Sequence, residues 1–261
     1  MRYLKSTLGG LLLAATVAAP AIAQDAPPPP APAPTPTPEF TLTGNVGVVS
    51  DYRFRGLTQT NEGFAAQGSL NLNHRSGLYA GVWASSIDDD VSLPGYGGAE
   101  LDLYAGYTRT FSNGVGVDVG LLYYFYPGGV GDTDWFEPYA SISYTIGPVK
   151  AKVGGNYSWG GQPGLGGQDS MYLYASLDVG IPGTPLTAKG RIGRSDGSLG
   201  AYNLDPLDDN YIDWSLGLEA TFRGHYVVGV QYVSTDITRR FGFADAIGAD
   251  PTVVVYGTIT F

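Results

Sequence analysis

The sequence predicts an all-β protein: a transmembrane antiparallel up-and-down β-barrel of about 12 strands, with short periplasmic turns and long acidic external loops. Three observations carry this prediction. From residue 40 onward, apolar and polar residues alternate along most of the chain, as in strands whose two faces meet different surroundings. The strands are even in number, and the connections between them are alternately short and long. Alternation alone also fits a soluble β-sandwich, so the connections decide between the two.

The composition favours strands and turns over helices. The chain of 261 residues has 39 glycines and 19 tyrosines, and 15% of its residues are charged. Tyrosine favours strands and glycine marks turns. A net charge of −10 argues against a nucleic-acid partner, which would need a basic face. The lack of cysteine excludes a disulfide framework and a zinc–thiolate site, so strand pairing must hold the fold.

The N-terminal region predicts export. Residues 1–23 resemble a secretory signal peptide, because a basic start precedes an apolar run and an A-x-A cleavage site that ends at Ala23. The run is shorter than the roughly 20 apolar residues of a spanning helix. Residues 24–39 are rich in proline and alanine and predict an extended periplasmic tether, since proline fixes φ and lacks an N–H donor. The barrel is expected over residues 40–261.

The first predicted strand is the longest. It covers Phe40 to Leu57 and places Tyr52 and Phe54 on its apolar face, opposite Arg53 and Arg55. Most of the others are long enough, at about 3.3 Å per residue and tilted, to cross an apolar band of roughly 25 Å. They are expected at residues 64–73, 78–85, 99–111, 115–126, 135–145, 149–159, 170–180, 186–194, 211–221, 226–235 and 252–261.

The last strand shows the pattern and its exceptions. Val253, Val255 and Ile259 share a face with Phe261, whereas threonines and Tyr256 occupy the other face. We expect the aliphatic face to meet lipid and this strand to pair with the first one, because an open edge cannot persist in lipid. Val254, and Val233 on the preceding strand, fall on the nominally polar side against the pattern.

The connections separate into two classes by length. The short turns are 74–77, 112–114, 146–148, 181–185 and 222–225, and the longer, mostly acidic loops are 87–98, 127–134, 160–169, 195–210 and 236–251. Because the two classes alternate, all short turns fall at one end. A soluble sandwich has no reason for this, whereas outer-membrane barrels have short periplasmic turns and long external loops. Both termini are therefore expected in the periplasm.

Aromatic residues gather near the predicted strand ends, as in the girdles of membrane barrels. The expected external girdle consists of Phe54, Phe64, Phe125, Phe136, Trp159, Trp214 and Tyr232. The expected periplasmic girdle consists of Tyr107, Phe111, Tyr144, Phe222, Tyr226 and Phe261.

The face opposite the lipid face carries many ionisable residues, which a dry core could not hold but a watery lumen can. The candidate pore-lining residues are Arg53, Arg55, Glu100, Asp102, Asp118, Glu137, Lys150, Lys152, Asp178, Lys189, Arg191, Asp213 and Glu219. Lys150, Lys152, Lys189 and Arg191 could form a basic track for anionic solutes. The alternative, which the narrow lumen favours, is that they pair with Asp178 on the strand between them.

The sequence holds no pattern typical of catalysis, a metal site or a cofactor. Both histidines, His74 and His225, fall in short turns, and no G-x-S-x-G motif is present. The acidic loops lack the spacing of a calcium loop. They are expected to be solvated turns, or alternatively to bridge to lipid phosphates through divalent cations. We expect no enzyme activity.

One stretch carries a family resemblance. Residues 50–60 (SDYRFRGLTQT), together with 67–73, 76–85 and 100–107, resemble the TorF-type porin family, a conserved family of Gram-negative outer-membrane proteins. The resemblance spans about residues 44–261 and implies an outer-membrane barrel with a porin role and no catalytic residues. Phe261 resembles the C-terminal aromatic signal read by the barrel-assembly machinery. The implied partners are that machinery, outer-membrane lipid and lipopolysaccharide, and small solutes.

Two functions remain open on the sequence alone. One is a porin that lets small hydrophilic solutes or ions diffuse through a water-filled lumen. The other is a non-conducting structural or surface-interaction barrel whose lumen is plugged by charged side chains. The sequence does not distinguish a monomer from a trimer.

Overall fold

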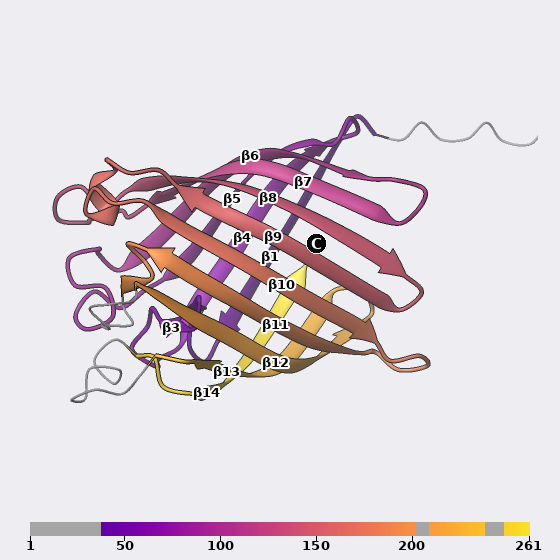
Figure 1. Cartoon of the computed structure of the whole chain (residues 1–261). Helices are drawn as coiled ribbons and strands as arrows, with labels where there is room; N and C mark the ends of the chain where they lie inside the picture. Colours follow the sequence, from indigo (N-terminus) through magenta and orange to yellow (C-terminus); the bar gives the residue numbers. More distant parts are fainter. Residues whose placement is uncertain (1–37, 202–208, 238–247) are drawn as a thin grey trace, which may run out of the picture. The chain divides into compact units, whose positions relative to one another are not determined.

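Twelve strands form a closed antiparallel barrel in the computed structural model, which describes residues 38–201, 209–237 and 248–261 (Figure 1). The predicted fold class is confirmed. The expected signal peptide and nearly all of the expected tether lie outside the described residues. The barrel strands are β1 (Phe40–Val49), β4 (Ala65–His74), β5 (Leu78–Ser86), β6 (Ala99–Thr110), β7 (Val115–Phe125), β8 (Trp135–Ile146), β9 (Val149–Ser158), β10 (Ser170–Gly180), β11 (Leu186–Gly197), β12 (Asn210–Phe222), β13 (Tyr226–Thr235) and β14 (Thr252–Thr260).

The barrel closes where the first and last strands meet. β1 pairs with β4 on one side and with β14 on the other, with Val46 opposite Ile259 across the closing seam. The chain end completes this seam, because Gly44 and Phe261 exchange backbone hydrogen bonds of 2.8 and 3.0 Å. No strand edge of the barrel is left open, which removes the unpaired backbone groups that lipid cannot satisfy.

The two ends of the barrel differ as predicted. Short turns join β4 to β5, β6 to β7, β8 to β9, β10 to β11 and β12 to β13, at the right in Figure 1. The longer connections lie at the opposite end, and one of them contains a single 3-10 turn, η1 (Pro163–Leu165). Phe40 pairs with His74 beside a short turn, and Phe261 pairs with Gly44, so the first and last strands begin and end at the short-turn end. Within the described ranges, no helix is long and apolar enough to cross a membrane.

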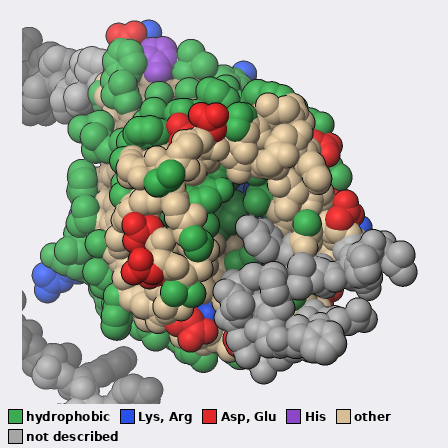
Figure 2. Space-filling model, turned by 90° about the vertical axis from the view of Figure 1, so that its left-hand side faces the viewer, with side chains coloured by type: hydrophobic (Ala, Val, Ile, Leu, Met, Phe, Trp, Pro, Cys, Tyr) green, Lys and Arg blue, Asp and Glu red, His purple; other side chains and the backbone are tan. Residues whose placement is uncertain are grey.

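The outer surface is apolar along the strands. On β14, Val253, Val255 and Ile259 are about half exposed, whereas Val254 between them is fully buried. The same alternation recurs around the barrel, and Figure 2, which views the long-loop end, shows hydrophobic side chains over much of the periphery and acidic ones around a central hollow. A band of exposed aliphatic side chains fits a lipid environment, because water would favour polar groups there.

The first predicted strand is wrong in its second half. β1 ends at Val49, and residues 50–64 fold into the barrel as a loop that contains a two-stranded sheet of β2 (Arg53–Phe54) and β3 (Leu57–Thr58). We call residues 50–64 the inward hairpin. Alternation continued across Val49 because the hairpin is itself extended, and the periodicity reports two unlike faces without saying which surroundings they meet.

Inward-facing tyrosines pair across strands with inward-facing glycines. Tyr104 lies opposite Gly81, Tyr139 opposite Gly120 and Tyr174 opposite Gly154. A Cβ built on any of these three glycines would come within 2.6 Å of the tyrosine ring or its hydroxyl. Each ring therefore lies across the neighbouring strand where only a glycine leaves room. This arrangement accounts for part of the high glycine and tyrosine content.

Three small clusters of buried side chains lie at the long-loop half of the barrel. In one of them Val49 and Ala65, at the two roots of the inward hairpin, pack with Val233 and Val254. Val233 and Val254 point inward, as the alternation required. They are apolar because the hairpin covers them. The buried apolar side chains thus form separate small clusters around the hairpin rather than one continuous core.

Candidate functional site: the lumen and its inward hairpin

The inward hairpin turns at Arg55 and Gly56. Both residues have positive φ, 48° and 87°, as the central positions of a type I′ turn require. Gly56 adopts this conformation freely, but a positive φ is uncommon for arginine. The surroundings therefore hold Arg55 in place.

A buried ion pair provides that restraint. Nη2 of Arg55 lies 2.6 Å from Oε1 of Glu137 on β8, and the two side chains are 4% and 1% exposed. Burial lowers the pKa of Arg55, but the Glu137 carboxylate together with Tyr124 and Tyr211 raises it more, so the net shift is upward and the guanidinium stays charged. Glu137 also accepts hydrogen bonds from Tyr124 and Asn156, both at 2.9 Å. The tip of the hairpin is thereby fixed to the wall.

Aromatic side chains hold Arg55 from other sides. Its guanidinium carbon lies 4.4 Å from the ring centre of Tyr172 on β10, and Tyr211 on β12 donates a hydrogen bond to its carbonyl oxygen at 3.0 Å. Tyr52 packs edge-on against Trp83 of β5, and Phe54 packs edge-on against Tyr124 of β7. These contacts reach strands on several sides of the barrel, so the hairpin crosses the lumen.

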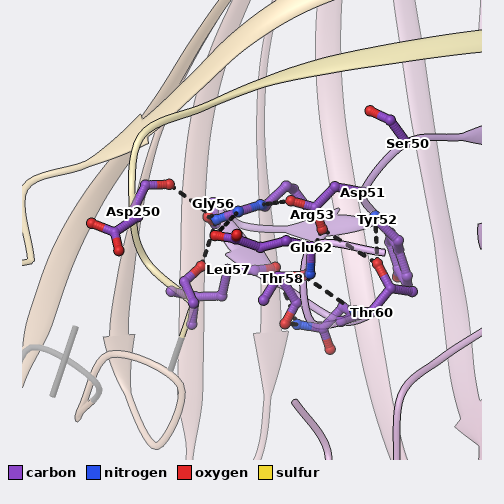
Figure 3. Close-up of polar contacts among 12 residues, drawn as sticks. Ser50, Asp51, Tyr52, Arg53, Gly56, Leu57, Thr58, Thr60, Glu62 and Asp250 are labelled. Carbon is purple, nitrogen blue, oxygen red and sulfur yellow. Dashed lines mark hydrogen bonds and ion pairs between the residues drawn. The ribbon is translucent and has the colours of Figure 1, made fainter. Parts of the chain in front are cut away.

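The base of the hairpin is organised by Asp51 (Figure 3). Its carboxylate accepts hydrogen bonds from Nε of Arg53, the hydroxyl of Thr58 and the hydroxyl of Thr60. Arg53 also donates to the carbonyl oxygens of Gly56 and Asp250, each at 3.2 Å. Asp51 therefore ties the incoming and returning arms of the hairpin together, and Arg53 links them to the loop before β14.

The predictions for this stretch change accordingly. Phe54 was expected in the external aromatic girdle and Tyr52 on the lipid face, and both are wrong: each packs inside the barrel. Burial, together with the carboxylates of Glu100 and Asp102, raises the pKa of Tyr52 well above its usual value, so its hydroxyl stays protonated.

Cavities lie on both sides of the hairpin. One of about 460 Å³ is lined by hairpin residues together with residues of the long loops. Two others, of about 300 and 480 Å³, are lined by hairpin residues and by side chains in the middle of the strands. We call the cavity at the long loops the outer cavity and the other two the inner cavities. Phe54 borders all three, so it forms part of the wall between the outer cavity and the inner ones.

The remaining candidate pore-lining residues lie on strands, at positions that alternate with the exposed aliphatic ones. Among them, Lys189 forms an ion pair of 3.3 Å with Glu219, and Arg191 lies over Tyr174 at 4.4 Å. Asp213, Arg191 and the two hairpin arginines line the cavity of about 300 Å³, and Asp102, Asp118 and Lys152 line that of about 480 Å³.

Asp178 stands where the sequence placed it, but the expected ion pairs do not form. It lies opposite Lys150 on β9 and Lys189 on β11. Within the described part of the chain, no nitrogen of either lysine is within ion-pair distance of it, and Lys189 pairs with Glu219 instead. The basic side chains near the short-turn end are thus only partly neutralised.

The residues that the sequence analysis missed are aromatic. The hairpin is held by Trp83, Tyr124, Tyr172 and Tyr211, none of which is among the charged residues predicted for the inner face. Tyr172 and Tyr174 precede Asp178 by an even number of residues, and side chains at even spacing point to the same face of a strand. This spacing places the tyrosines on the inner face and could have identified them.

The histidines and the loop carboxylates have local partners. His74 lies 2.7 Å from the hydroxyl of Ser76 and 3.3 Å from Glu39 at the short-turn end. In the long loops, Asp88 accepts hydrogen bonds from the backbone N–H groups of Val91 and Ser92. Such carboxylates organise turns in the loops. In the described ranges, no three His, Cys, Asp or Glu residues converge as a metal site would require.

Comparison with known proteins agrees with the barrel. Residues 33–261 match the model of a family described as "Bacterial protein of unknown function (Gcw_chp)". The match does not bear on the TorF-type resemblance, whose name remains unconfirmed. No curated protein sequence matches the chain significantly.

Two solved structures share the fold. A NanC porin superposes with a TM-score of 0.55 at 12% identity, covering 85% of this chain and 99% of its own. A KdgM porin, solved in complex with disordered oligogalacturonate, superposes with a TM-score of 0.53 at 7% identity, covering 84% of this chain and 97% of its own. At such identities the likeness concerns the fold alone: the chain is a porin-like barrel.

Proposed function

The chain belongs to the bacterial family of unknown function Gcw_chp, and we propose that it is an outer-membrane porin through which small hydrophilic solutes or ions diffuse passively. The observation that carries the proposal is the contrast between the two surfaces of the barrel. The outer surface exposes aliphatic side chains, whereas the inner surface carries charged and polar side chains around cavities. Such a contrast suits a water-filled passage through lipid.

We place the long loops outside the cell and the short turns in the periplasm, with cleavage near Ala23 and both ends of the barrel sequence on the periplasmic side. Short periplasmic turns are the rule in barrels of this kind. The barrel is proposed to act as a passage, with no catalytic role.

The inward hairpin makes this a restricted passage. It meets the wall through Arg55, Phe54 and Tyr52, so solutes have to pass between the hairpin and the wall. Arg191 is the arginine of the inner cavity that remains exposed in the lumen. Its charge, with that of Lys150, is expected to favour anions, because a fixed charge in a narrow passage raises the local concentration of counter-ions.

Planar-bilayer recording of the purified, folded barrel tests the proposal. Discrete conductance steps are expected, and the reversal potential in a salt gradient should move toward cation preference when Arg191 is replaced by glutamate. Arg194→Glu provides the matched control, because Arg194 pairs with Asp196 on the outer half of the same strand. Silent bilayers from protein that still shows the heat-modifiable migration of a folded barrel would refute the porin and leave a non-conducting barrel.

A further inference from the structure

A tyrosine-rich cleft lines one side of the lumen. It has a volume of about 480 Å³ and is walled by the hairpin and by side chains from the middle of β5 to β10. More than half of the residues around it are aromatic: Tyr52, Phe54, Trp83, Tyr104, Tyr124, Tyr139 and Tyr174. Tyr52, Phe54, Trp83 and Tyr124 join the hairpin to the wall, so Tyr104, Tyr139 and Tyr174 are the aromatic residues that call for another explanation.

The tyrosine rings lie flat along the wall. A Cβ at Gly81 would be 2.6 Å from Cε2 of Tyr104, and a Cβ at Gly154 would be 2.6 Å from Cζ of Tyr174. Each ring therefore rests with one face on the glycine of the next strand. Both rings also line the cleft, and the guanidinium of Arg191 lies 4.4 Å from the ring centre of Tyr174.

Hydrogen bonds hold the rings of Tyr104 and Tyr139 in position. The hydroxyl of Tyr104 donates to Oδ1 of Asn71 at 2.5 Å. The hydroxyl of Tyr79 donates to Asp118 at 2.6 Å and also meets the hydroxyl of Tyr139. Because the hydroxyls are engaged at the wall, the ring faces form a rigid surface that loses little conformational entropy when a ligand binds.

Polar groups stand beside these faces. Asp102 is 9% exposed, and its Oδ1 has no hydrogen-bond partner among the described residues. Lys152 and Asn156 line the same cleft. Asp118 and Lys152 carry opposite charges on this lining, so the cleft does not favour an anion.

We propose that this cleft is a binding subsite for the ring of a neutral sugar. A pyranose has an apolar face of C–H groups that suits the negative face of an aromatic ring, and its rim of hydroxyls can both donate and accept hydrogen bonds. The proposal deepens the proposed function by assigning a solute class to the lumen. It requires that solutes reach the lumen, but binding can be measured without conductance.

The test is equilibrium binding of maltotriose and cellotriose to the folded full-length chain. Calorimetry and tryptophan fluorescence would be recorded in an amine-oxide detergent, because alkyl-glycoside detergents carry a sugar headgroup. Trp83 lies in the cleft, so binding is expected to change its emission. Tyr104→Leu and Tyr174→Leu should each weaken binding by about tenfold, the scale of one aromatic contact.

Tyr256→Leu is the matched control. Tyr256 also lies across a glycine, Gly229, but it is not among the residues that line this cleft. Its replacement should leave sugar affinity unchanged.

Several outcomes would overturn the proposal. They are absence of binding by both trisaccharides, equal binding of the open-chain polyol sorbitol, tighter binding of trigalacturonate than of maltotriose, or equal losses in Tyr104→Leu and Tyr256→Leu. Conductance without sugar binding would support the porin proposal and refute the sugar subsite. Sugar binding by a barrel that does not conduct would support the sugar subsite and refute the porin proposal.

Discussion

Arg55 and Glu137, separated by 82 residues in the chain, meet at 2.6 Å inside the barrel and join the tip of the inward hairpin to the wall. Removing one partner of a buried ion pair leaves the other charge uncompensated, which lowers the free energy of unfolding by about 3–5 kcal/mol. Glu137→Leu should therefore lower the urea midpoint of the folded barrel strongly. The double variant Arg55→Leu/Glu137→Leu should recover much of the loss, because no charge then remains unpaired.

The same pair should control the passage. In single-channel recordings Glu137→Leu is expected to raise conductance or current noise, since the hairpin loses its anchor. If the single and double variants have equal midpoints and unchanged currents, the ion pair has no part in holding the hairpin.

Phe54 separates the outer cavity from the inner ones, so Phe54→Ala should increase single-channel conductance. Its ring is only partly buried, and the loss of stability should be smaller than the about 3–5 kcal/mol of a fully buried phenylalanine. Phe64→Ala is the control, because Phe64 is 82% exposed. An unchanged conductance in Phe54→Ala would show that the route bypasses the hairpin tip.

Gly56 combines a positive φ with close neighbours. A Cβ there would lie 2.5 Å from Cγ2 of Thr235 and 3.1 Å from Cβ of Asp213. Gly56→Ala should therefore destabilise the hairpin by more than the about 1–2 kcal/mol of left-handed strain alone. Gly95→Ala measures the strain by itself, because Gly95 has a φ of 85° and open space around its Cβ position. Limited proteolysis and urea midpoints report both changes, and equal effects would contradict the proposed steric role.

The tyrosine–glycine pairs predict how a side chain added at the glycine changes stability. A Cβ at Gly120 would lie 2.4 Å from the hydroxyl of Tyr139, so Gly120→Ala should displace that ring and cost about 1–3 kcal/mol. Gly257→Ala, where no atom lies within 4 Å of the added Cβ, should be nearly neutral. Urea midpoints and near-ultraviolet circular dichroism of the two variants should differ clearly, and similar values would mean that the tyrosine rings adapt freely.

Phe261 is the proposed assembly signal and also covers Gly44 at the closing seam. Phe261→Ala keeps the backbone hydrogen bonds of the seam, so we expect a larger fall in the yield of barrel assembled in the membrane than in the urea midpoint of purified barrel. Phe222→Ala, at another exposed aromatic near the short turns, should leave the yield unchanged. An equal loss of yield and stability in Phe261→Ala would speak against a signal read during assembly.

Much of the barrel could be predicted because its rules are local. Period-two alternation sets which face of each strand is apolar, and turn residues set where strands end, so β10 and β13 have the predicted bounds and most other strands differ by one or two residues. The inner face also follows from alternation, which is why Val254 and Val233 point inward although their chemistry suggested otherwise.

The sequence by itself thus determined the strands, their order and their two faces, because each depends on residues close together in the chain. Only the tertiary structure decided that residues 50–64 fold into the lumen, that Arg55 meets Glu137, and that tyrosines lie flat on glycines of the neighbouring strands. These contacts join segments that are tens of residues apart. An extended segment with two unlike faces looks the same in sequence whether it crosses lipid or lies inside the barrel, so the surroundings of the inward hairpin appear only once the barrel has closed around it.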